Sequence, residues 1–325
     1  MKIAIVKLSA LGDIIQSAFV VQFIKKAYPD ATLHWFAEEK FSGVLEGVPG
    51  VDRVCPVNLS RLKKSPSALF DEIRHIRRYG YYDVVIDMQG LIKSAIVSRL
   101  LGDDVRGFGK EGLREKQAAW FYTKGYAIPY DTPTTDRYRL LASEALGFTL
   151  SKEEVLAKAP YMYVKERPEF VPQGAYALFV VGSTWQSRVY PKEQFVKVAQ
   201  GLHMPVVVAH GNEEEKAFAE YLAEHASNVT VLPKISLHEL KAVVSHSTLV
   251  IGNDTGPTYL GWACNKPTVL LFGPTPPVRV YSDERTILLK SPSSVDPLKL
   301  NKNDYSIKEI SPAEILDAAA RVMAS

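Results

Sequence analysis

The sequence predicts an α/β protein built from two doubly wound, parallel-sheet domains that face one another across a cleft. Short apolar runs such as Ile3–Val6 and Leu249–Ile251 are typical of strands buried on both faces of a parallel sheet. A loop and a helix follow each run, and this order repeats in both halves of the chain. A charged, proline-spaced segment at 151–174 separates the halves and suits an interdomain connection.

The length of 325 residues gives room for two domains of roughly 150 residues each. We expect a first domain over 1–160 and a second over 172–310. The remaining 311–325 is predicted to be a C-terminal helix, with the first domain as its candidate packing partner. With 46% hydrophobic and 23% charged residues, the composition is that of an ordinary globular protein, and a net charge of +3 is too small to indicate nucleic acid as a partner.

Cysteine usage and hydropathy bear on where the protein works. Cys55 and Cys264 lie in apolar surroundings far apart in the chain, so we expect reduced core thiols of a cytoplasmic protein rather than a disulfide or a metal site. The first apolar run is interrupted by Lys7, which argues against an export signal. Apolar runs of 18 residues are absent from the sequence, so any membrane contact is expected at the surface.

Strands and helices alternate through the first half. Runs of β-branched and apolar residues predict strands at Ile3–Val6, Leu33–Phe36, Val51–Val54 and Val84–Ile86. Apolar residues at helical spacing, Ser-Pro at a helix start and glycine after a helix end predict helices at Ile14–Lys26, Ser65–Gly80, Leu91–Leu101 and Thr135–Leu146.

The second half repeats the pattern. Its predicted strands are Tyr176–Val181, Pro205–Ala209, Val229–Leu232, Leu249–Ile251 and Thr268–Phe272. Its predicted helices are Pro191–Leu202, Glu213–Ala226, Leu237–Ser245 and a capped amphipathic helix from Ser311 to Met323.

The stretch Leu249–Thr258 stands out because a buried strand ends there in a polar, glycine-bearing turn and a helix begins at once. Pro257 is tolerated in a first helical turn, and Asp254 or Thr255 can cap its free amides. A helix that starts at the carboxyl end of a strand favours an anion by ~0.3–1 kcal/mol. From this stretch alone, phosphate binding and an ordinary strand–helix turn both remain open.

Four stretches together resemble the heptosyltransferases of lipopolysaccharide inner-core synthesis. They are KLSALGDIIQSAFVV, DVVIDMQGLIKSA, Pro233–Leu237 and GNDTGPTYLGWACNKPTVLLFGPT. Within that family, Gln89–Ala95 is more similar to the heptosyltransferase I group than to heptosyltransferase II.

This resemblance implies the GT-B architecture, in which two Rossmann-like domains face a central cleft and the second holds most of the nucleotide sugar. It also implies inverting, metal-independent transfer of heptose from ADP-L-glycero-D-manno-heptose to the Kdo of Kdo-lipid A. The donor is a substrate, and no cofactor and no nucleic acid are implied. The expected location is the cytoplasmic surface of the inner membrane, with peripheral association.

Inverting transfer is a single displacement, so a base must take the proton of the acceptor hydroxyl as it attacks the anomeric carbon. Asp13 stands at the start of the first helix, after the loop that ends the first strand. The resemblance implies that Asp13 is this base. Helix capping is the alternative interpretation, and it is compatible with the catalytic one.

Negative charge grows on the departing diphosphate, and a cation or an amide-rich loop must meet it. The sequence contains no Asp-x-Asp pair of the kind that often holds a divalent metal on such a diphosphate. We therefore expect this charge to be met without a metal by Arg188, Ser183, Thr184 and the amides of Thr255 and Gly256. Relatives usually carry lysine where this chain has Arg188, and arginine adds a bidentate fork. A solvated loop cation is the alternative for Arg188.

The resemblance supplies the remaining donor contacts. Asp254 would contact hydroxyls of the transferred sugar, Glu213 the ribose, and Ile235 the adenine. Tyr259 takes the place of a histidine that is common in heptosyltransferase I, which puts an acid–base role there in doubt. Solvated Glu213 and plain core packing of Ile235 are the alternatives.

Basic residues of the first half are candidates for an anionic acceptor, since each lysine or arginine near an anionic lipid surface is worth ~1 kcal/mol. The candidates are Arg61, Lys63, Lys64, Lys110 and Arg114. A solvated face is the alternative for such a charge run.

Three rival functions remain open at this stage. Heptosyltransferase II would use the same donor and a heptosylated acceptor. A GT-B-like sugar-nucleotide epimerase would need no acceptor. A non-catalytic lipid-surface or nucleotide-binding module would not depend on Asp13.

Overall fold

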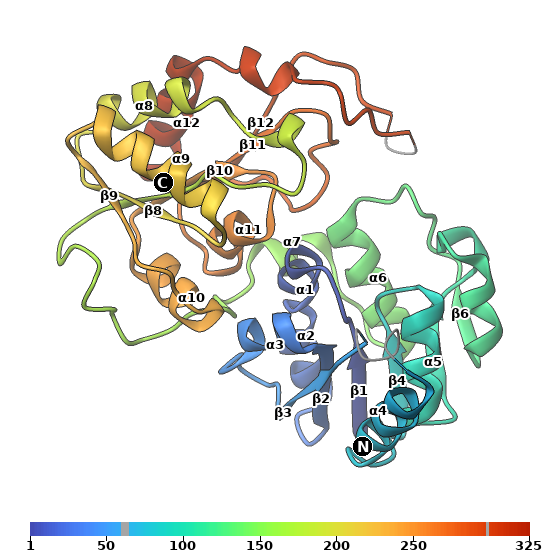
Figure 1. Cartoon of the computed structure of the whole chain (residues 1–325). Helices are drawn as coiled ribbons and strands as arrows, with labels where there is room; N and C mark the ends of the chain where they lie inside the picture. The colour runs from blue at the N-terminus through green and yellow to red at the C-terminus, as the bar shows by residue number, and fades with distance from the viewer. Residues whose placement is uncertain (60–64, 297–298) are drawn as a thin grey trace. The chain divides into compact units, whose positions relative to one another are not determined.

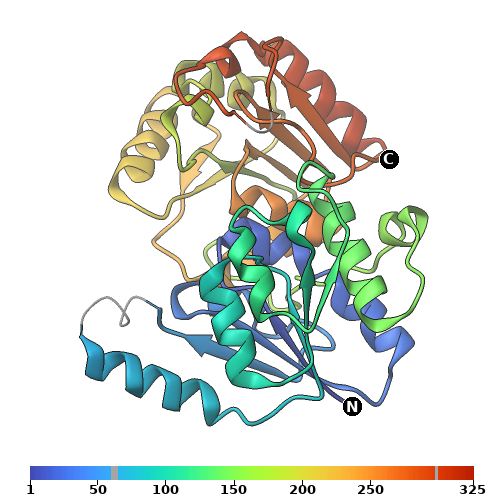
Figure 2. The same ribbon diagram turned by 90° about the vertical axis from the view of Figure 1, so that its right-hand side faces the viewer.

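The computed structural model describes residues 1–59, 65–296 and 299–325. The chain forms two compact units, Met1–Tyr161 and Met162–Ser325. In Figure 1 the first unit runs from blue to green and the second from green to red. Each unit has a parallel sheet with helices on both of its faces (Figure 1 and Figure 2). None of the described helices is long and apolar enough to cross a membrane.

The sheet of the first unit has six parallel strands in the order β3-β2-β1-β4-β5-β6. The strands are β1 (Lys2–Val6), β2 (Thr32–Glu38), β3 (Arg53–Val57), β4 (Val84–Asp87), β5 (Val105–Phe108) and β6 (Lys124–Tyr126). Strand order reverses between β1 and β4, and ligands of open α/β sheets bind beyond the carboxyl ends of the strands at such a point.

Helices of the first unit connect these strands. They are α1 (Leu11–Ser17), α2 (Val20–Ala27), α3 (Glu39–Ser42), α4 (Pro66–Arg77), α5 (Ile92–Leu101), α6 (Thr134–Leu146) and α7 (Lys152–Leu156), with short 3₁₀ turns η1 (Gly43–Leu45), η3 (Lys110–Gly112) and η4 (Lys116–Phe121). The predicted caps are present, because Ser65 accepts from the Ala68 amide at 3.2 Å and Gly147 ends α6 with φ 75°.

The second unit repeats the topology with six parallel strands in the order β12-β11-β10-β7-β8-β9. Its strands are β7 (Ala177–Val180), β8 (Val206–Ala209), β9 (Val229–Val231), β10 (Leu249–Asn253), β11 (Thr268–Phe272) and β12 (Thr286–Lys290). Its helices are α8 (Lys192–Gly201), α9 (Glu213–His225), α10 (Leu237–His246), α11 (Gly256–Ala263) and α12 (Pro312–Met323), with 3₁₀ turns η5 (Gln186–Arg188) and η6 (Ser306–Glu309). The order reverses between β7 and β10.

The predicted fold class, two doubly wound parallel sheets, is confirmed. The predicted strand at Val51–Val54 starts and ends too early, because β3 is an edge strand that tolerates Pro56 and runs on to Val57. The single helix predicted at Ile14–Lys26 is two helices. The Ser17 hydroxyl donates to the carbonyl of Asp13 at 2.7 Å, a bond that bends helices, just before the turn that separates α1 from α2.

The C-terminal helix α12 packs within the second unit, against α8 and β11. Ile315, Ala318, Ala319 and Val322 form one apolar face and are part of the buried core of that unit. A stripe at this spacing has to be covered, and helix α8 together with strands β10, β11 and β12 covers it.

Candidate active site

Strands β7 and β10 meet closely where the second sheet changes direction. Gly252 pairs with Val180 across these strands, and a Cβ on Gly252 would lie 2.6 Å from the Val180 Cβ. The Asn253 amide nitrogen then donates to the carbonyl of Val181 at 2.7 Å, and its oxygen accepts from the amide of Tyr190 at 3.1 Å. The loops that follow β7 and β10 are therefore tied together at the carboxyl edge of the sheet.

Asp254 is the centre of the polar network on this edge. Its side chain is only 4% exposed, and both of its carboxylate oxygens are engaged. The hydroxyl of Tyr259, one turn further along α11, donates to one oxygen, and Thr275 donates to the other at 2.6 Å. The Ser183 hydroxyl donates to the backbone carbonyl of Asp254 at 3.3 Å, which ties the predicted loop 182–184 to the backbone of this residue.

Arg188 forms an ion pair with this carboxylate, with 3.6 Å between Nη1 of Arg188 and Oδ2 of Asp254. On its other side the guanidinium lies over the indole of Trp185, 4.0 Å from the ring centroid. Burial lowers the pKa of Arg188; Asp254 opposes this shift and the neighbouring Arg279 adds to it. The alternative of a solvated loop cation is therefore wrong for Arg188.

Tyr259 is buried, 3% exposed, and its hydroxyl points to Asp254 rather than away from it. Burial, together with the Asp254 carboxylate, raises the pKa of Tyr259 well above its ordinary value. The phenol therefore stays protonated and acts as a hydrogen-bond donor to Asp254. Sequence reasoning missed Thr275, which comes to this site only because β11 lies next to β10.

The helix after β8 carries the predicted Glu213 and also a second glutamate, Glu215, in its first turn. Glu213 is exposed in the first turn of α9. Glu215, two residues on, accepts from the amide of Gly211 at 2.7 Å, and its carboxylate occupies the space that a Cβ on Gly182 would need. The pattern Asn212-x-x-Glu215, a capping arrangement, was the signal that could have located it.

The other predicted donor residues also follow strand ends of the second sheet. Thr255 is the N-cap of α11 and Gly256 its first residue, so their amides stand where helix geometry leaves N–H groups without intrahelical partners. Thr184 is exposed, and Ile235 is half-buried just before α10.

In the first unit, Asp13 lies in the first turn of α1, beyond the carboxyl end of β1, as predicted. It is half-buried, and its Oδ2 accepts from the Ala10 amide at 3.3 Å. This is the helix-terminus role considered as the alternative. A carboxylate can accept from more than one donor, so capping and proton acceptance are compatible.

Loops after β1 and β4 are joined beside Asp13. The Ser9 amide donates to Oε1 of Gln89 at 3.1 Å, and the Gln89 amide nitrogen donates back to the Ser9 hydroxyl at 3.3 Å. Lys93 reaches the same hydroxyl at 3.4 Å and pairs with Glu38 at 3.3 Å. Sequence reasoning did not assign Lys93 to this site, although it lies within the quoted motif.

Below these loops lie two buried ionisable groups. Asp87 accepts from the amides of Gln89 and Gly90 at 2.9 and 3.0 Å and from two side-chain hydroxyls, and burial raises its pKa. Burial lowers the pKa of Lys7, but Tyr138 and the carboxylates of Asp13 and Asp87 outweigh it, so the net shift is upward. Lys7 is therefore a charged ammonium close to the candidate base.

The predicted acceptor residues are only partly accounted for. Lys110, in η3, and Arg114 are both exposed and follow β5 in the first unit. Arg61, Lys63 and Lys64 lie outside the described residues. Among the residues that are described, no three His, Cys, Asp or Glu side chains form a group that could hold a metal ion.

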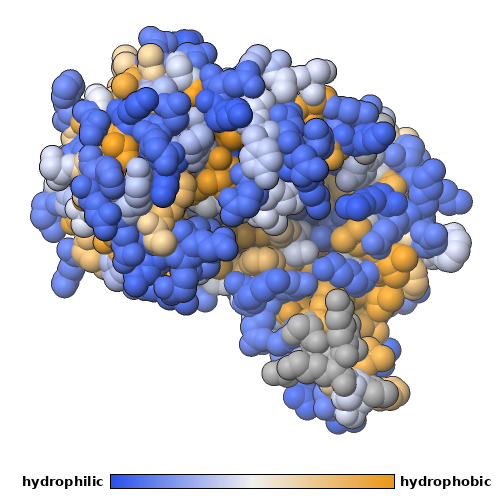
Figure 3. Space-filling view, turned by 45° about the horizontal axis from the view of Figure 1, so that its top comes forward, coloured by the Kyte–Doolittle hydropathy of each residue, from blue (hydrophilic) through white to orange (hydrophobic). Residues whose placement is uncertain are grey.

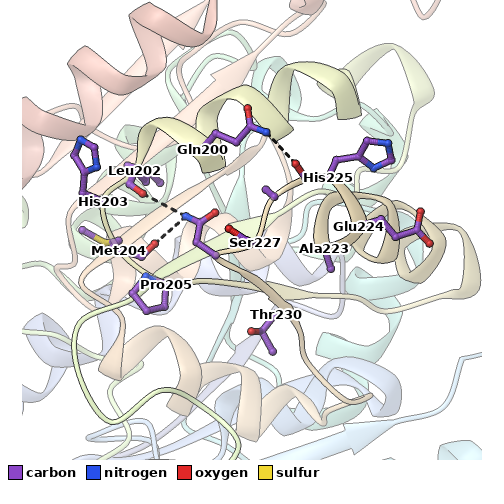
Figure 4. Close-up of a pocket in the computed structure, with 12 residues that line it drawn as sticks. Gln200, Leu202, His203, Met204, Pro205, Ala223, Glu224, His225, Ser227 and Thr230 are labelled. Atoms are coloured by element: carbon purple, nitrogen blue, oxygen red, sulfur yellow. Dashed lines mark hydrogen bonds between the residues drawn. The ribbon is translucent and has the colours of Figure 1, made fainter.

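A separate open pocket of about 980 Å³ lies beside the amino ends of strands in the second sheet (Figure 4). Pro205 and Asn228, which line it, directly precede β8 and β9, so it faces the amino ends of the strands. The Asn228 amide donates to the carbonyls of Ala199, Leu202 and Met204 at 2.8, 3.3 and 3.0 Å. This residue ties loops together, and the pocket is not the donor site predicted above.

Comparison with known proteins identifies the family of this chain. Residues 72–300 match the model of glycosyltransferase family 9 (heptosyltransferase). The chain is 34% identical to lipopolysaccharide heptosyltransferase 1 of Campylobacter coli, over 97% of either chain. It is 31% identical to that of Pseudomonas aeruginosa, over 85% of this chain and 80% of the relative.

Among solved structures, the chain is similar to E. coli heptosyltransferase WaaC with ADP-2-deoxy-2-fluoro heptose. The TM-score is 0.79 and the sequences are 25% identical, over 98% of each chain. This likeness confirms the GT-B architecture that the sequence resemblance implied. Together with two sheets of the same topology and a polar network at a strand–helix junction, these matches show that the chain belongs to glycosyltransferase family 9, the heptosyltransferases.

Proposed function

We propose that this protein transfers L-glycero-D-manno-heptose from ADP-heptose to the Kdo of Kdo-lipid A, with inversion at the anomeric carbon. The single observation that carries the proposal is the Asp254 network at the start of α11, where Arg188 is held by Asp254 against Trp185. A fixed cation beside the free amides of a helix start is suited to a departing diphosphate. Relatives named lipopolysaccharide heptosyltransferase 1 support heptose as the sugar and lipopolysaccharide synthesis as the process.

In the proposed reaction Asp13 takes the proton of the acceptor hydroxyl while that oxygen attacks the anomeric carbon. The bond from this carbon to the diphosphate breaks in the same step, and ADP leaves with the electron pair. Arg188 and the amides of Thr255 and Gly256 stabilise the charge that grows on ADP. Ser183, Thr184, Glu213 and Ile235 contribute to binding of the donor. Asp254 contacts hydroxyls of the transferred sugar and also holds Arg188.

We also propose that transfer needs no added metal ion. The support is a cation in the place where a metal could neutralise the diphosphate, because Arg188 is partly buried and forms an ion pair with Asp254 on this edge. Addition of a chelator is therefore expected to leave the rate unchanged. Inhibition that magnesium reverses would refute this part of the proposal.

The protein is further proposed to work at the cytoplasmic face of the inner membrane, with the first unit in contact with lipid. Phe70 on α4, Ile96 on α5 and Trp120 on η4 are 69%, 43% and 76% exposed, and α5 packs against both α4 and η4. Apolar atoms are visible on the surface of the first unit in Figure 3. Exposed apolar side chains flanked by cations are typical of peripheral membrane contacts.

Cations on the same elements complement an anionic lipid surface. They are Arg74 and Arg77 on α4, Arg99 on α5 and Lys116 on η4, and all four are exposed. The expected result is that the double variant Phe70→Ser, Trp120→Ser sediments less with vesicles containing anionic lipid, while its affinity for ADP is unchanged. Equal sedimentation of the variant and wild type would refute lipid contact by this face.

One assay separates the proposal from its rivals. The purified protein is incubated with ADP-heptose in three parallel reactions. The first contains Kdo-lipid A, the second an acceptor that already carries one heptose, and the third no acceptor. Mass spectrometry should find a product heavier by one heptose with Kdo-lipid A. Product only with the heptosylated acceptor would indicate heptosyltransferase II, and conversion of ADP-heptose without acceptor would indicate an epimerase.

A further inference from the structure

Gln89 joins two loops at the carboxyl edge of the first sheet. Its Oε1 accepts from the Ser9 amide at 3.1 Å, and its Nε2 donates to the Ser9 hydroxyl at 3.3 Å. Both residues follow strands that end together, because Val6 of β1 pairs with Asp87 of β4. One side chain therefore holds the backbone and the side chain of Ser9 at the same time.

The turn that carries Gln89 is itself fixed by a buried carboxylate. Asp87 is 0% exposed. Its Oδ1 accepts from the amides of Gln89 and Gly90 at 2.9 and 3.0 Å. Its Oδ2 accepts from the hydroxyls of Ser94 and Tyr122, each at 2.8 Å. A network in which both oxygens are satisfied is rigid, so Gln89 reaches Ser9 from a firm support.

Ser9 leads directly into the candidate base. Ala10, the next residue, is the N-cap of α1, and its amide donates to Oδ2 of Asp13 at 3.3 Å. On the other side of Ser9, the carbonyl of Leu8 accepts from the amide of Glu38 at 2.9 Å. A displacement of the backbone between Leu8 and α1 would therefore move the Ala10 amide and change the orientation of the Asp13 carboxylate.

We infer that Gln89 is a positioning residue for the candidate base. By holding Ser9 it keeps the Ala10 amide in place, and this amide helps to orient the Asp13 carboxylate towards the acceptor hydroxyl. The inference deepens the proposed function and rests on it. A base has to lie within hydrogen-bond reach of the proton that it takes, and a displacement of about 1 Å can slow a reaction about 100-fold.

The first test is the steady-state kinetics of Gln89→Ala, which removes both bonds to Ser9. We expect kcat to fall about 10- to 100-fold, because the base is less well oriented. The KM for ADP-heptose should stay near that of wild type, since the predicted donor residues belong to the second unit. A higher KM for ADP-heptose with unchanged kcat would overturn the inference.

Gln22 provides a matched control in the same unit. Its Oε1 accepts from the Ala159 amide at 3.0 Å, and its Nε2 donates to the Ala159 carbonyl at 3.5 Å. Like Gln89 it is half-buried and binds one distant residue twice. Gln22→Ala should therefore leave kcat unchanged. A loss of kcat equal to that of Gln89→Ala would show a general structural effect and overturn the inference.

A conservative variant should rescue the rate. In Gln89→Glu the new carboxylate can accept from the Ser9 amide and from the Ser9 hydroxyl, so kcat should recover to within about 10-fold of wild type, the effect of one hydrogen bond. Circular dichroism verifies folding. If Gln89→Ala does not fold, Gln89→Asn takes its place, because its amide is one methylene too short to reach Ser9.

A double-mutant cycle shows whether Gln89 acts through Asp13. Gln89→Ala is combined with Asp13→Asn, and residual transfer is measured under single-turnover conditions. If the effect of Gln89 passes through the base, the second change should slow residual transfer by less than about 3-fold. A loss as large as in the wild-type background would mean that Gln89 acts on the substrate independently of Asp13, and would overturn the inference.

Amide hydrogen exchange, followed by mass spectrometry, reports on the loop without any transfer reaction. In Gln89→Ala a peptide that contains Ser9 and Ala10 should exchange about 2- to 10-fold faster, the effect of one lost hydrogen bond. Gln22→Ala should leave it unchanged. Unchanged exchange in Gln89→Ala would overturn the inference, and so would faster exchange with unchanged kcat. If exchange is faster but wild type transfers no heptose to any acceptor, Gln89 still holds the loop and the proposed function fails.

Discussion

Removing the Tyr259 hydroxyl tests whether its hydrogen bond holds the Asp254 carboxylate in place. In Tyr259→Phe the ring still fills its buried site, but one oxygen of Asp254 loses its donor. Thr275 and Arg188 remain on the other oxygen. The carboxylate is then free to turn, and Arg188 loses the partner that fixes it over Trp185.

The magnitude follows from the burial of both groups. Tyr259 and Asp254 are 3% and 4% exposed, so water cannot replace the missing donor. Leaving a charged group short of a hydrogen bond costs about 1.5–3 kcal/mol. A domain of about 150 residues loses roughly 2–4 °C in Tm per kcal/mol, so the Tm of the variant should fall by roughly 3–12 °C.

Thermal unfolding and transfer kinetics are measured together on the variant. Because Arg188 stabilises the departing ADP in the proposed reaction, kcat should fall while the KM for the acceptor stays near that of wild type. Tyr259→His retains a hydrogen-bond donor and should recover part of both losses. Tyr305→Phe, at a phenol that is 49% exposed, is the matched control and should change neither.

A Tm within about 1 °C of wild type, together with unchanged kcat, would refute the reasoning, because a loss of at least 3 °C is expected from the buried contact. A fall in Tm with unchanged kcat would show that Tyr259 is structural only.

Three further predictions concern the scaffold. Gly252→Ala places a Cβ 2.6 Å from the Val180 Cβ and 2.9 Å from the Val180 carbonyl oxygen, so overpacking should lower the free energy of unfolding in urea by about 1–3 kcal/mol and weaken ADP binding. Gly174→Ala is the control, because a Cβ there would have open space around it. Equal stability of the two variants would contradict the account. Burial raises the pKa of Cys55 to about 12, so the native state keeps a proton that the unfolded state releases. The free energy of unfolding should therefore fall as pH rises from about 9 towards 12, less steeply in Cys55→Ala, and an identical slope in the variant would count against it. Asn228→Ala removes an amide that donates to three carbonyls and should lower the free energy of unfolding by about 1–3 kcal/mol. Its ADP affinity should not change. A changed affinity would link the pocket of Figure 4 to the donor site.

Local signals were enough to place Asp13 and Asp254 after the ends of strands, although their roles came from the family resemblance. The change from a buried strand to a capped helix at Leu249–Thr258 predicts a turn at a carboxyl edge, and that is where Asp254 and Gly256 lie. Asp13 follows from the same logic after β1. Short-range patterns succeed here because each residue is positioned by the strand and helix next to it in the chain.

Partners from distant strands could not be predicted in this way. Thr275 reaches Asp254 because β11 lies beside β10, and Lys302 reaches Trp185 because η6 packs on η5. Strand order has no local signature in the sequence. The short strands β5, β6 and β12 were also missed, since VRGF and KGY contain glycine and TILLK fits a helix as well as a strand.

The most direct test of the central claim is a single-turnover assay of Asp13→Asn, with ADP-heptose prebound and Kdo-lipid A added. Asparagine keeps an oxygen for the Ala10 amide, so the start of α1 is preserved and only the basic group is lost. The account predicts that ADP affinity is unchanged and that the transfer rate falls by about 10²–10⁴-fold. Transfer at a rate near that of wild type would contradict it.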